Sequence, residues 1–231
     1  MEKLIEFETN HNPEIDEKFH QLNIGNIGNV LYWYKFFEMV SNVPGDIVEC
    51  GIGRGRSLLV LSALNSLLNK EEGGKRDIYG YDSFEGFPDP STEDNSFRNP
   101  KKGEWSHSPT GKYKYSEDFI KLVLAEAKIP VNQFKTELGK GYFSDSLKHH
   151  HDKPIAILHV DGDLYQSYKD TLENLYPKVS KGGVVVFDDF LAEKSEEDRW
   201  PGARRAVEEF LGDDIKNLKI SSRGTPYFIK G

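Results

Sequence analysis

The sequence predicts an α/β domain built around a mostly parallel β-sheet. Short apolar strands alternate with amphipathic helices along the chain, which is the pattern of strand–helix–strand units. Two of the strands, at 155–160 and 184–187, are almost entirely apolar and run directly into aspartates. A glycine-rich turn at 51–55 joins an earlier strand to a helix. Because ligands bind outside the carboxyl ends of such strands, these residues mark the expected functional edge.

The composition fits a single globular domain. The chain has 231 residues and a net charge of −8, and without a basic patch this charge argues against nucleic acid as a partner. No apolar run approaches the roughly 18 to 20 residues that span a bilayer, and the N-terminus has no secretory signal. The single cysteine, Cys50, excludes an internal disulfide and is expected to be a small buried residue. We therefore expect a cytoplasmic protein with neither nucleic acid nor membrane as a partner.

The first half of the domain is expected to contain two helices and two strands. Residues 1–28 are polar and irregular, so the domain is expected to span 29–231. Helical spacing predicts a helix over 29–41 that packs through Val30, Trp33, Tyr34, Phe37 and Val40. After the break at Pro44 and Gly45, we expect a strand at 46–49, a leucine-rich helix at 57–69 and a second strand at 77–81.

The segment from 83 to about 115 carries no regular pattern. It contains four prolines, several glycines and the aromatic residues Phe84, Phe87, Phe97 and Trp105. Segments of this length in a compact domain are usually functional or disordered. The aromatic residues favour a lid that orders over a ligand, and the alternative is a mobile insertion without a role.

The second half repeats the alternation. Helices are expected at 117–128, 143–148, 165–176 and 201–211, where Pro201 suits the first turn of a helix. Strands are expected at 133–138, 155–160 and 184–187, and a closing antiparallel pair at 219–220 and 227–229. No repeat, linker or second domain is visible in this order of elements.

The glycine-rich turn after the first strand predicts a ligand site. Gly51 and Gly53 let the backbone approach a ligand, and the following helix N-terminus favours a negative group. Nicotinamide and flavin enzymes use a similar turn. Two details favour another ligand: Glu49 could attract an ammonium group, and Arg56 replaces the third glycine of the dinucleotide pattern. The methionyl part of S-adenosylmethionine carries both an ammonium and a carboxylate group and suits this pairing. The alternative is a structural glycine turn.

Two further positions extend this site. Asp82 ends the second strand, where a carboxylate can accept hydrogen bonds from both hydroxyls of a ribose. The turn from Gly139 to Tyr142 follows the third strand, where it could border an adenine ring. The alternative for Asp82 is a helix or loop cap.

The aspartates predict a cation. Asp161 and Asp163 follow one strand, and Asp188 and Asp189 follow another. A buried carboxylate is costly to keep ionised unless a cation pairs with it. An oxygen-rich site of this kind prefers Mg²⁺, Ca²⁺ or Mn²⁺ over zinc. The alternative is a set of loop caps and salt bridges to Lys181 or Arg204.

Several segments together resemble the macrocin O-methyltransferase family. They are PGDIVECG at 44–51, YDSFEGF at 81–87, HVDGDLY at 159–165, FDDF at 187–190 and GARRAV at 202–207. The matches occur in order over roughly residues 29 to 230. The first 28 residues and the segment beyond Phe87 depart from the pattern. His159 stands where an apolar residue is expected, and we expect a structural histidine there.

The resemblance implies a Rossmann-like class I methyltransferase fold with a seven-stranded, mostly parallel sheet and helices on both faces. It implies a dimeric enzyme that uses S-adenosylmethionine and Mg²⁺ to methylate a hydroxyl of a sugar or glycosylated small molecule in natural product biosynthesis. Asp161, Asp188 and Asp189 would hold the metal, and Asp163 would be the general base beside the catalytic Asp161. Glu49, Gly51, Ser57 and Asp82 would hold the cofactor, together with the adjoining Gly53, Ser83 and Gly141. Residues 83–115 would be the lid over the substrate.

Three other functions stay open on the sequence. A catechol-type enzyme that methylates a phenol would use the same cofactor and a similar metal site. An NAD-dependent oxidoreductase is disfavoured by Glu49 and by the missing third glycine. A non-enzymatic nucleotide- or metal-binding module would bind the cofactor without turnover.

Overall fold

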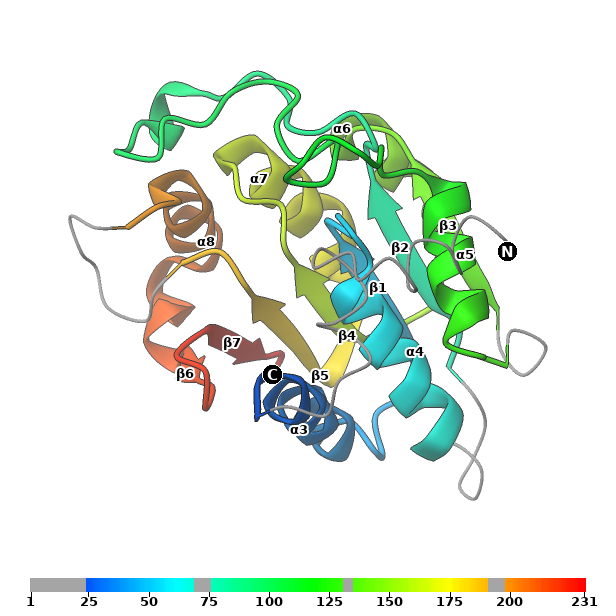
Figure 1. The fold of residues 1–231 in the computed structure, drawn as a ribbon. Coiled ribbons are helices and arrows are strands. Elements are labelled where there is room, and N and C mark those ends of the chain that lie inside the picture. The colour runs from blue at the N-terminus through cyan, green and yellow to red at the C-terminus, as the bar shows by residue number, and fades with distance from the viewer. Residues whose placement is uncertain (1–23, 69–75, 131–134, 191–197) are drawn as a thin grey trace.

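The computed structural model describes residues 24–68, 76–130, 135–190 and 198–231. Its centre is a seven-stranded sheet in the order β3-β2-β1-β4-β5-β7-β6 (Figure 1). The strands are β1 Asp46–Cys50, β2 Ile78–Asp82, β3 Thr136–Lys140, β4 Ile155–Val160, β5 Val179–Phe187, β6 Lys219–Ile220 and β7 Pro226–Ile229. The first five are parallel, and β7 pairs antiparallel with β5 and β6. The predicted seven-stranded, mostly parallel sheet is confirmed.

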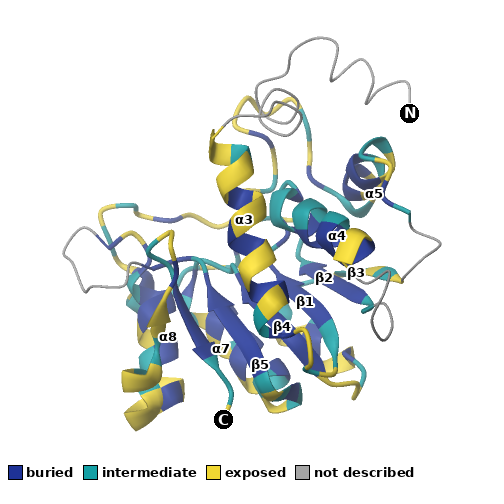
Figure 2. Ribbon diagram, turned by 90° about the horizontal axis from the view of Figure 1, so that it is seen from below, coloured by how far each residue is buried: buried dark blue, intermediate teal, exposed yellow. Residues whose placement is uncertain are grey.

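Helices cover both faces of the sheet (Figure 2). The helices α3 Ile24–Met39, α4 Arg56–Leu68 and α5 Glu117–Glu126 pack on one face, and α7 Tyr165–Leu175 and α8 Pro201–Leu211 pack on the other. The short helix α6 Phe143–Ser146 follows β3. Each face has its own apolar core, and the side chains of a strand alternate between the two cores. In β1, for example, Ile47 belongs to one core and Val48 to the other.

The first helix differs from the expectation. It begins at Ile24 rather than Asn29, so residues 24–28 belong to the helix and not to an irregular segment. Its buried side chains include Tyr32, Trp33 and Phe36, whereas the predicted packing residues Val30 and Tyr34 are exposed. The helix continues through two glycines because its buried aromatic face packs on the sheet, and this contact outweighs local propensity. Residues 1–23 lie outside the described ranges.

Other boundaries shift by a few residues. The strand β5 begins at Val179, earlier than the expected Val184, and its pairing with β4 is irregular between Ile155 and Ile157. The strand β3 runs through Gly139 to Lys140, where a turn was expected. Cys50 is fully buried in β1, as expected, and burial raises the pKa of its thiol. None of the helices in the described ranges has the length and apolarity that a bilayer span requires.

The long segment after β2 is folded against the domain by a buried aspartate. Asp94 is 3% exposed and lies in the 3-10 turn η1 Thr92–Asp94. Its Oδ2 atom accepts hydrogen bonds from the backbone and hydroxyl of Ser91, and Oδ1 accepts one of 2.7 Å from the backbone of Tyr165 at the start of α7. A β-carbon on Gly202 would lie 2.0 Å from Oδ1, so glycine allows α8 to approach this anchor. The part of the segment around Asp94 is therefore fixed to α7 and α8.

Candidate functional site

A cavity of about 910 Å³ opens at the carboxyl ends of the central parallel strands. This volume is at the upper end of the range for ligand pockets, so it has room for two molecules of modest size. The predicted site residues that line it are Gly51, Gly53, Ser57, Asp82, Ser83, Asp161, Asp163, Asp188 and Asp189. Glu49 and Gly141 are not among the lining residues. The structure therefore brings most of the predicted site together in one cavity.

The glycine turn holds β1 against β4. Gly51 has a φ of +101°, and a β-carbon on it would lie 1.7 Å from the carbonyl oxygen of Asp161. The backbone of Asp161 donates a hydrogen bond to the carbonyl of Cys50, so the two strand ends are fixed side by side. Gly53 has a φ of +52°, and a β-carbon on it would meet nothing within 4 Å. The backbone at Gly53 is therefore open to a ligand.

Asp82 connects this turn to β2. Its Oδ2 atom accepts a hydrogen bond of 2.8 Å from the backbone of Gly53, and Oδ1 accepts one of 2.7 Å from the backbone of Phe84. Burial raises the pKa of Asp82 against these hydrogen bonds. Asp82 therefore caps the loop, as the alternative predicted. Each carboxylate oxygen can still accept a hydrogen bond from a further donor. The hydroxyl of Ser83 donates to the carbonyl of Gly86 and so stabilises a local turn.

Three aspartates converge at the ends of β4 and β5. One carboxylate oxygen from each of Asp161, Asp188 and Asp189 lies within 4.8 Å of the other two. Burial and the charges of Asp188 and Asp189 raise the pKa of Asp161 well above its usual range. Burial and Asp188 raise the pKa of Asp189 to about 6. Carboxylates that repel one another in this way are stabilised by a shared cation, so the cluster could hold a hard divalent metal ion.

Within the described ranges, no lysine or arginine forms an ion pair with this cluster, but His159 Nε2 lies 4.0 Å from Asp188 Oδ1. The predicted alternative partner Arg204 instead pairs through Nε with Asp198 at 3.0 Å. Lys181 is not in any recorded ion pair with the described aspartates. The loop-cap alternative holds in part, because Asp189 Oδ2 accepts a hydrogen bond of 2.7 Å from the backbone of Asp163.

Asp163 occupies a different place from the three clustered aspartates. Its φ of +59° is left-handed, so the alternation of the strand does not continue from Asp161. Burial and the charge of Asp189 raise the pKa of Asp163 well above its usual range. Its side chain lines the cavity beside the cluster. A carboxyl group at this position can exchange a proton with a hydroxyl group bound in the cavity.

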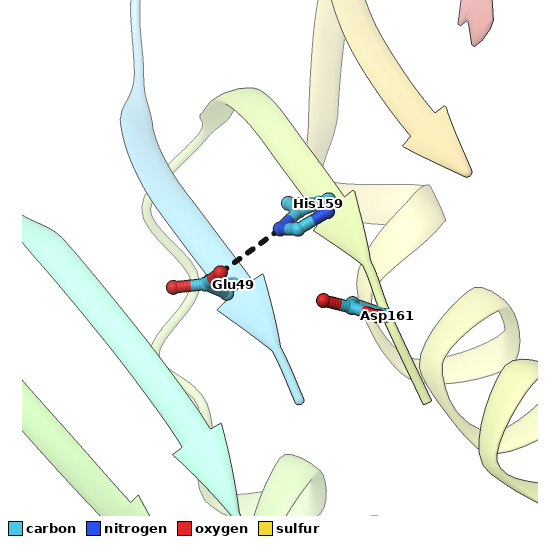
Figure 3. Close-up of side chains that lie close together, drawn as sticks. All are labelled: Glu49, His159 and Asp161. Carbon is cyan, nitrogen blue, oxygen red and sulfur yellow. Dashed lines mark hydrogen bonds and ion pairs between the residues drawn. The ribbon is translucent and has the colours of Figure 1, made fainter. Parts of the chain in front are cut away.

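Glu49 and His159 form a buried pair, and Figure 3 shows Asp161 beside them. One ligand atom from each of these three residues lies within 4.8 Å of the other two. The register of β1 and β4 places the two residues side by side, and His159 Nδ1 lies 3.0 Å from Glu49 Oε1. Both side chains are at most 1% exposed. Trp33 of α3 packs edge-on against the imidazole at a centroid distance of 4.7 Å. The expected structural histidine is thus fully buried, and the cofactor role of Glu49 stays a prediction.

Sequence reasoning missed several residues that shape the site. Tyr168 of α7 donates its hydroxyl proton to the carbonyl of Val160, and the same hydroxyl accepts a hydrogen bond from the backbone of Asp189. It therefore holds the ends of β4 and β5 together from below. Trp200 and Arg223 also line the cavity. The sequence carries no local signal for them, because their contacts come from distant parts of the chain.

Comparison with known proteins agrees with this geometry. The profile of the macrocin-O-methyltransferase (TylF) family matches residues 37–218. Over 170 residues, the chain is 33% identical to demethyldecarbamoylnovobiocin O-methyltransferase of Streptomyces niveus, with 74% of this chain and 59% of that protein covered. It is 28% identical over 186 residues to 8-demethyl-8-(2,3-dimethoxy-alpha-L-rhamnosyl)-tetracenomycin-C 4'-O-methyltransferase of Streptomyces olivaceus, with 75% of this chain and 60% of that protein covered.

A solved structure supports the fold. The crystal structure of CalS11, a calicheamicin methyltransferase, has a TM-score of 0.78 to this chain at 24% identity, with 100% of this chain and 91% of that chain covered. The Rossmann-like class I methyltransferase fold is thereby confirmed. The chain spans about 60% of the length of the two curated relatives that it matches. Because the family profile covers most of the sequence, this chain belongs to the macrocin-O-methyltransferase (TylF) family.

Proposed function

We propose that this protein is an S-adenosylmethionine-dependent O-methyltransferase that acts on a hydroxyl of a sugar or glycosylated small molecule. The observation that carries the proposal is one cavity lined by the glycine turn, by Asp82 and by the aspartate cluster. Family membership supports the methyl-transfer reaction. A rhamnosyl group in the name of the tetracenomycin relative supports a sugar acceptor. The assignment leaves an NAD-dependent oxidoreductase without support.

The residues fit the cofactor at its nucleoside end. Gly53 presents open backbone, and Asp82 lies beside it with a carboxylate that can accept from ribose hydroxyls. Gly51 and Ser57 border the same part of the cavity. Gly141 donates its backbone N–H to the carbonyl of Asp82, so it supports the edge of the site from outside the cavity. Ser83 shapes the turn that follows.

The donor set also fits a divalent cation. Asp161, Asp188 and Asp189 offer oxygen atoms only, which favours Mg²⁺, Mn²⁺ or Ca²⁺. Such an ion would compensate the negative charges that repel one another in this cluster. When bound, the cation would lower the pKa of an acceptor hydroxyl, and S-adenosylmethionine would supply an electrophilic methyl group. Asp161, Asp188 and Asp189 would hold that cation, and both the presence of a metal and its identity stay predictions.

The chain itself would move the proton and exclude water. Asp163 lines the cavity next to the cluster, and its carboxylate would accept the proton of the acceptor hydroxyl as general base. The segment 83–115 contributes Asp89, Lys102 and Trp105 to the wall of the cavity. Its anchor at Asp94 fixes the chain between Asp89 and Lys102, and the proposed lid role is the exclusion of water from the reaction.

Several expectations accompany this proposal. A homodimer, a cytoplasmic location and a single domain over 29–231 stay predictions. A catechol-type enzyme is the alternative, because its acceptor would use the same cofactor and a similar metal site. The two differ in the base: a phenol ionises more easily than a sugar hydroxyl, so a phenolic substrate would depend less on Asp163.

The direct test is methyl transfer to a panel of acceptors. The protein is incubated with S-adenosylmethionine, Mg²⁺ and either rhamnosides or catechols, and products are identified by mass spectrometry. We expect methylated glycosides, and we expect Asp163→Asn to lower the rate by about 10² to 10⁴-fold. Methylation of catechols alone, with a pH–rate profile unchanged in Asp163→Asn, would replace the sugar acceptor by a phenol. Binding of S-adenosylhomocysteine without turnover on any acceptor would contradict an enzymatic role.

A further inference from the structure

Two arginines on distant parts of the chain face the same side of the cavity. Arg56 is the first residue of α4, immediately after the glycine turn, and Arg223 lies in the turn between β6 and β7. Both line the cavity that holds the aspartate cluster. They are separated by most of the sequence, so the fold and not local chain geometry brings them together.

The turn that carries Arg223 is held in place by a network of hydrogen bonds. The backbone of Ser221 donates to the carbonyl of Thr225 at 2.9 Å, and Gly224 donates back to Ser221 at 3.0 Å with a φ of +82°. The hydroxyls of Ser221 and Thr225 lie 2.8 Å apart, and Thr225 also lies 2.9 Å from the hydroxyl of Tyr32 on α3. The turn is therefore fixed to α3, and its position is set before any ligand arrives.

The guanidinium of Arg223 is itself oriented by α3. Nη1 donates a hydrogen bond of 3.0 Å to Asn29 Oδ1, and the guanidinium carbon lies 4.8 Å from the centre of the Tyr32 ring. Neither partner carries a negative charge, so the positive charge of Arg223 is positioned but not neutralised. Its remaining N–H groups stay available to a ligand in the cavity.

The charge of Arg56 is likewise not neutralised by an acidic partner among the residues that the structure describes. Burial and the nearby charges of Arg54 and Arg223 lower its pKa, and only Asp188 acts in the opposite direction. Across the described residues, no ion pair is recorded for Arg56 or Arg223. Since Asp188 belongs to the proposed metal site, a bound cation would reduce its effect on Arg56 further. Adjacent guanidinium groups without an acidic partner are stabilised by an anion that bridges them.

We propose that Arg56 and Arg223 form a subsite for an oxyanion group, a carboxylate or a phosphate, on a molecule that binds in this cavity. The proposal rests on the proposed function for the presence of such a molecule. Two sources carry the required chemistry: the carboxylate of the methionyl end of the cofactor, and a phosphate on a sugar nucleotide acceptor. Arginine suits both, because its planar fork can donate two parallel hydrogen bonds to an oxyanion.

The experiment compares two ligands that differ in the amino-acid end, which carries the carboxylate. S-adenosylhomocysteine carries the amino-acid end, and 5′-methylthioadenosine shares its nucleoside and sulfur but lacks that end. Their dissociation constants are measured by calorimetry on the wild-type protein and on the double variant Arg56→Gln, Arg223→Gln. The matched control is Arg205→Gln, an exposed arginine that pairs with Glu93 and Glu209 on the outside of α8. A second arm measures pyrophosphate and a nucleoside-diphosphate hexose on protein saturated with S-adenosylhomocysteine.

Two outcomes support the subsite and identify its ligand. If the anion is the cofactor carboxylate, the double variant loses at least tenfold in affinity for S-adenosylhomocysteine and keeps its affinity for 5′-methylthioadenosine. If the anion belongs to the acceptor, the variant keeps both of these affinities and loses at least tenfold for the diphosphates. The variant Arg56→Lys, Arg223→Lys retains the charge and recovers part of the lost affinity in either case.

Other outcomes overturn the proposal. Unchanged affinity for all four ligands in a variant with wild-type melting temperature would show that the arginines bind no oxyanion. An equal loss for both nucleosides would assign the arginines a general structural role instead. If the wild-type protein binds diphosphates but not S-adenosylhomocysteine, the proposed methyl transfer fails while the oxyanion subsite stands. If it binds none of the four ligands, both fail.

Discussion

The acidic side chains near the carboxyl ends of the strands lie in two different environments. Glu49 is paired with a histidine inside the protein, whereas the aspartate cluster lines the cavity. On the closed side, Glu49 lies under the sheet edge with His159 3.0 Å away and Trp33 packed over the imidazole. On the open side, Asp161 and its neighbours face a cavity, and their charges repel one another. Both sets are close to the same backbone, because Gly51 keeps β1 against β4.

This difference separates structure from function. An acid that the fold pairs with its own base has its charge compensated within the protein, and removal of either partner is destabilising. The clustered aspartates have one nearby base, His159, whose Nε2 lies 4.0 Å from Asp188 Oδ1. Their mutual repulsion is costly in the empty protein, so they indicate a cation that binds from outside. The Glu49–His159 pair leaves two polar atoms without a hydrogen-bond partner, because Glu49 Oε2 and His159 Nε2 are both buried. The following substitutions test the contrast.

The largest effect is expected from the open side. Asp161→Asn should lower methyl transfer by about 10³-fold, because it removes both a metal ligand and the charge that holds the cation. The metal-free variant should be as stable as the wild type or more stable, since one repelling charge is gone. Activity is measured with labelled S-adenosylmethionine, and stability by thermal melting without metal. Asp118→Asn, on the exposed face of α5, is the control for loss of one charge. A variant that keeps full activity would remove Asp161 from the reaction centre.

The closed side should respond in stability instead. Glu49→Ala leaves His159 buried without its partner, and the free energy of unfolding should fall by about 3 kcal/mol. Glu49→Gln keeps an oxygen for the imidazole N–H and should cost about 1 kcal/mol. Urea denaturation measures both. If Glu49→Ala were as stable as the wild type, the Glu49–His159 pair would not be a structural element of the fold.

The aspartate cluster also predicts an unusual pH dependence. The pKa of Asp189 is raised in the folded protein from 3.8 to about 6, so between these values the folded state binds more protons than the unfolded state. Stability of the metal-free protein should therefore fall as pH rises from about 4 to about 6, by up to about 3 kcal/mol from this group. The raised pKa values of Asp161 and Asp163 extend the fall to higher pH.

The cation should reverse this trend. Mg²⁺ should raise the melting temperature more at pH 7 than at pH 5, because it competes with protons for the same oxygens. Melting curves over this range are compared with those of Asp161→Asn, in which the cluster has one charge fewer. A wild-type curve that rises more steeply with pH than that of the variant would mean that the clustered acids are already compensated within the fold.

The smallest effect is expected at Gly53, which presents only its backbone to the cavity. Gly53→Ala forces a left-handed φ on a residue with a side chain, at a cost of about 1 kcal/mol, but its β-carbon meets nothing within 4 Å. The methyl group would point into the space that the cofactor is proposed to use. We therefore expect a small loss of stability and a clear loss of affinity for S-adenosylhomocysteine in calorimetry. Unchanged affinity would place the cofactor elsewhere in the cavity.

Local sequence signals predicted the fold where packing and pattern agree. The strand Ile155–Val160 and the helix Pro201–Leu211 have the expected bounds, because uniform apolarity and a first-turn proline are strong local signals. The start of the first helix was wrong, since Gly25 and Gly28 suggested a loop and burial of Tyr32 overrides that preference. The parallel sheet, and the edge at which the acids meet, followed from the alternation of strands and helices.

The parts of the site that could not be predicted depend on register and long-range contact. Glu49 and His159 become partners only once β1 and β4 are adjacent in the observed register. Asp94 serves as an anchor because α7 presents the backbone of Tyr165 to it. Arg223 reaches the cavity because the β6–β7 turn packs on Tyr32 of α3. Each of these relations joins residues with no common local pattern.

The most direct test of the contrast between the two sides is metal binding itself. Mn²⁺ is titrated by calorimetry into metal-free wild-type protein, Asp161→Asn and Glu49→Gln at pH 7. Saturable binding by the wild type and by Glu49→Gln, with at least tenfold weaker binding by Asp161→Asn, is the predicted result. Equal binding by all three proteins, or no binding by the wild type, would contradict the claim that the clustered aspartates are gathered to hold a cation.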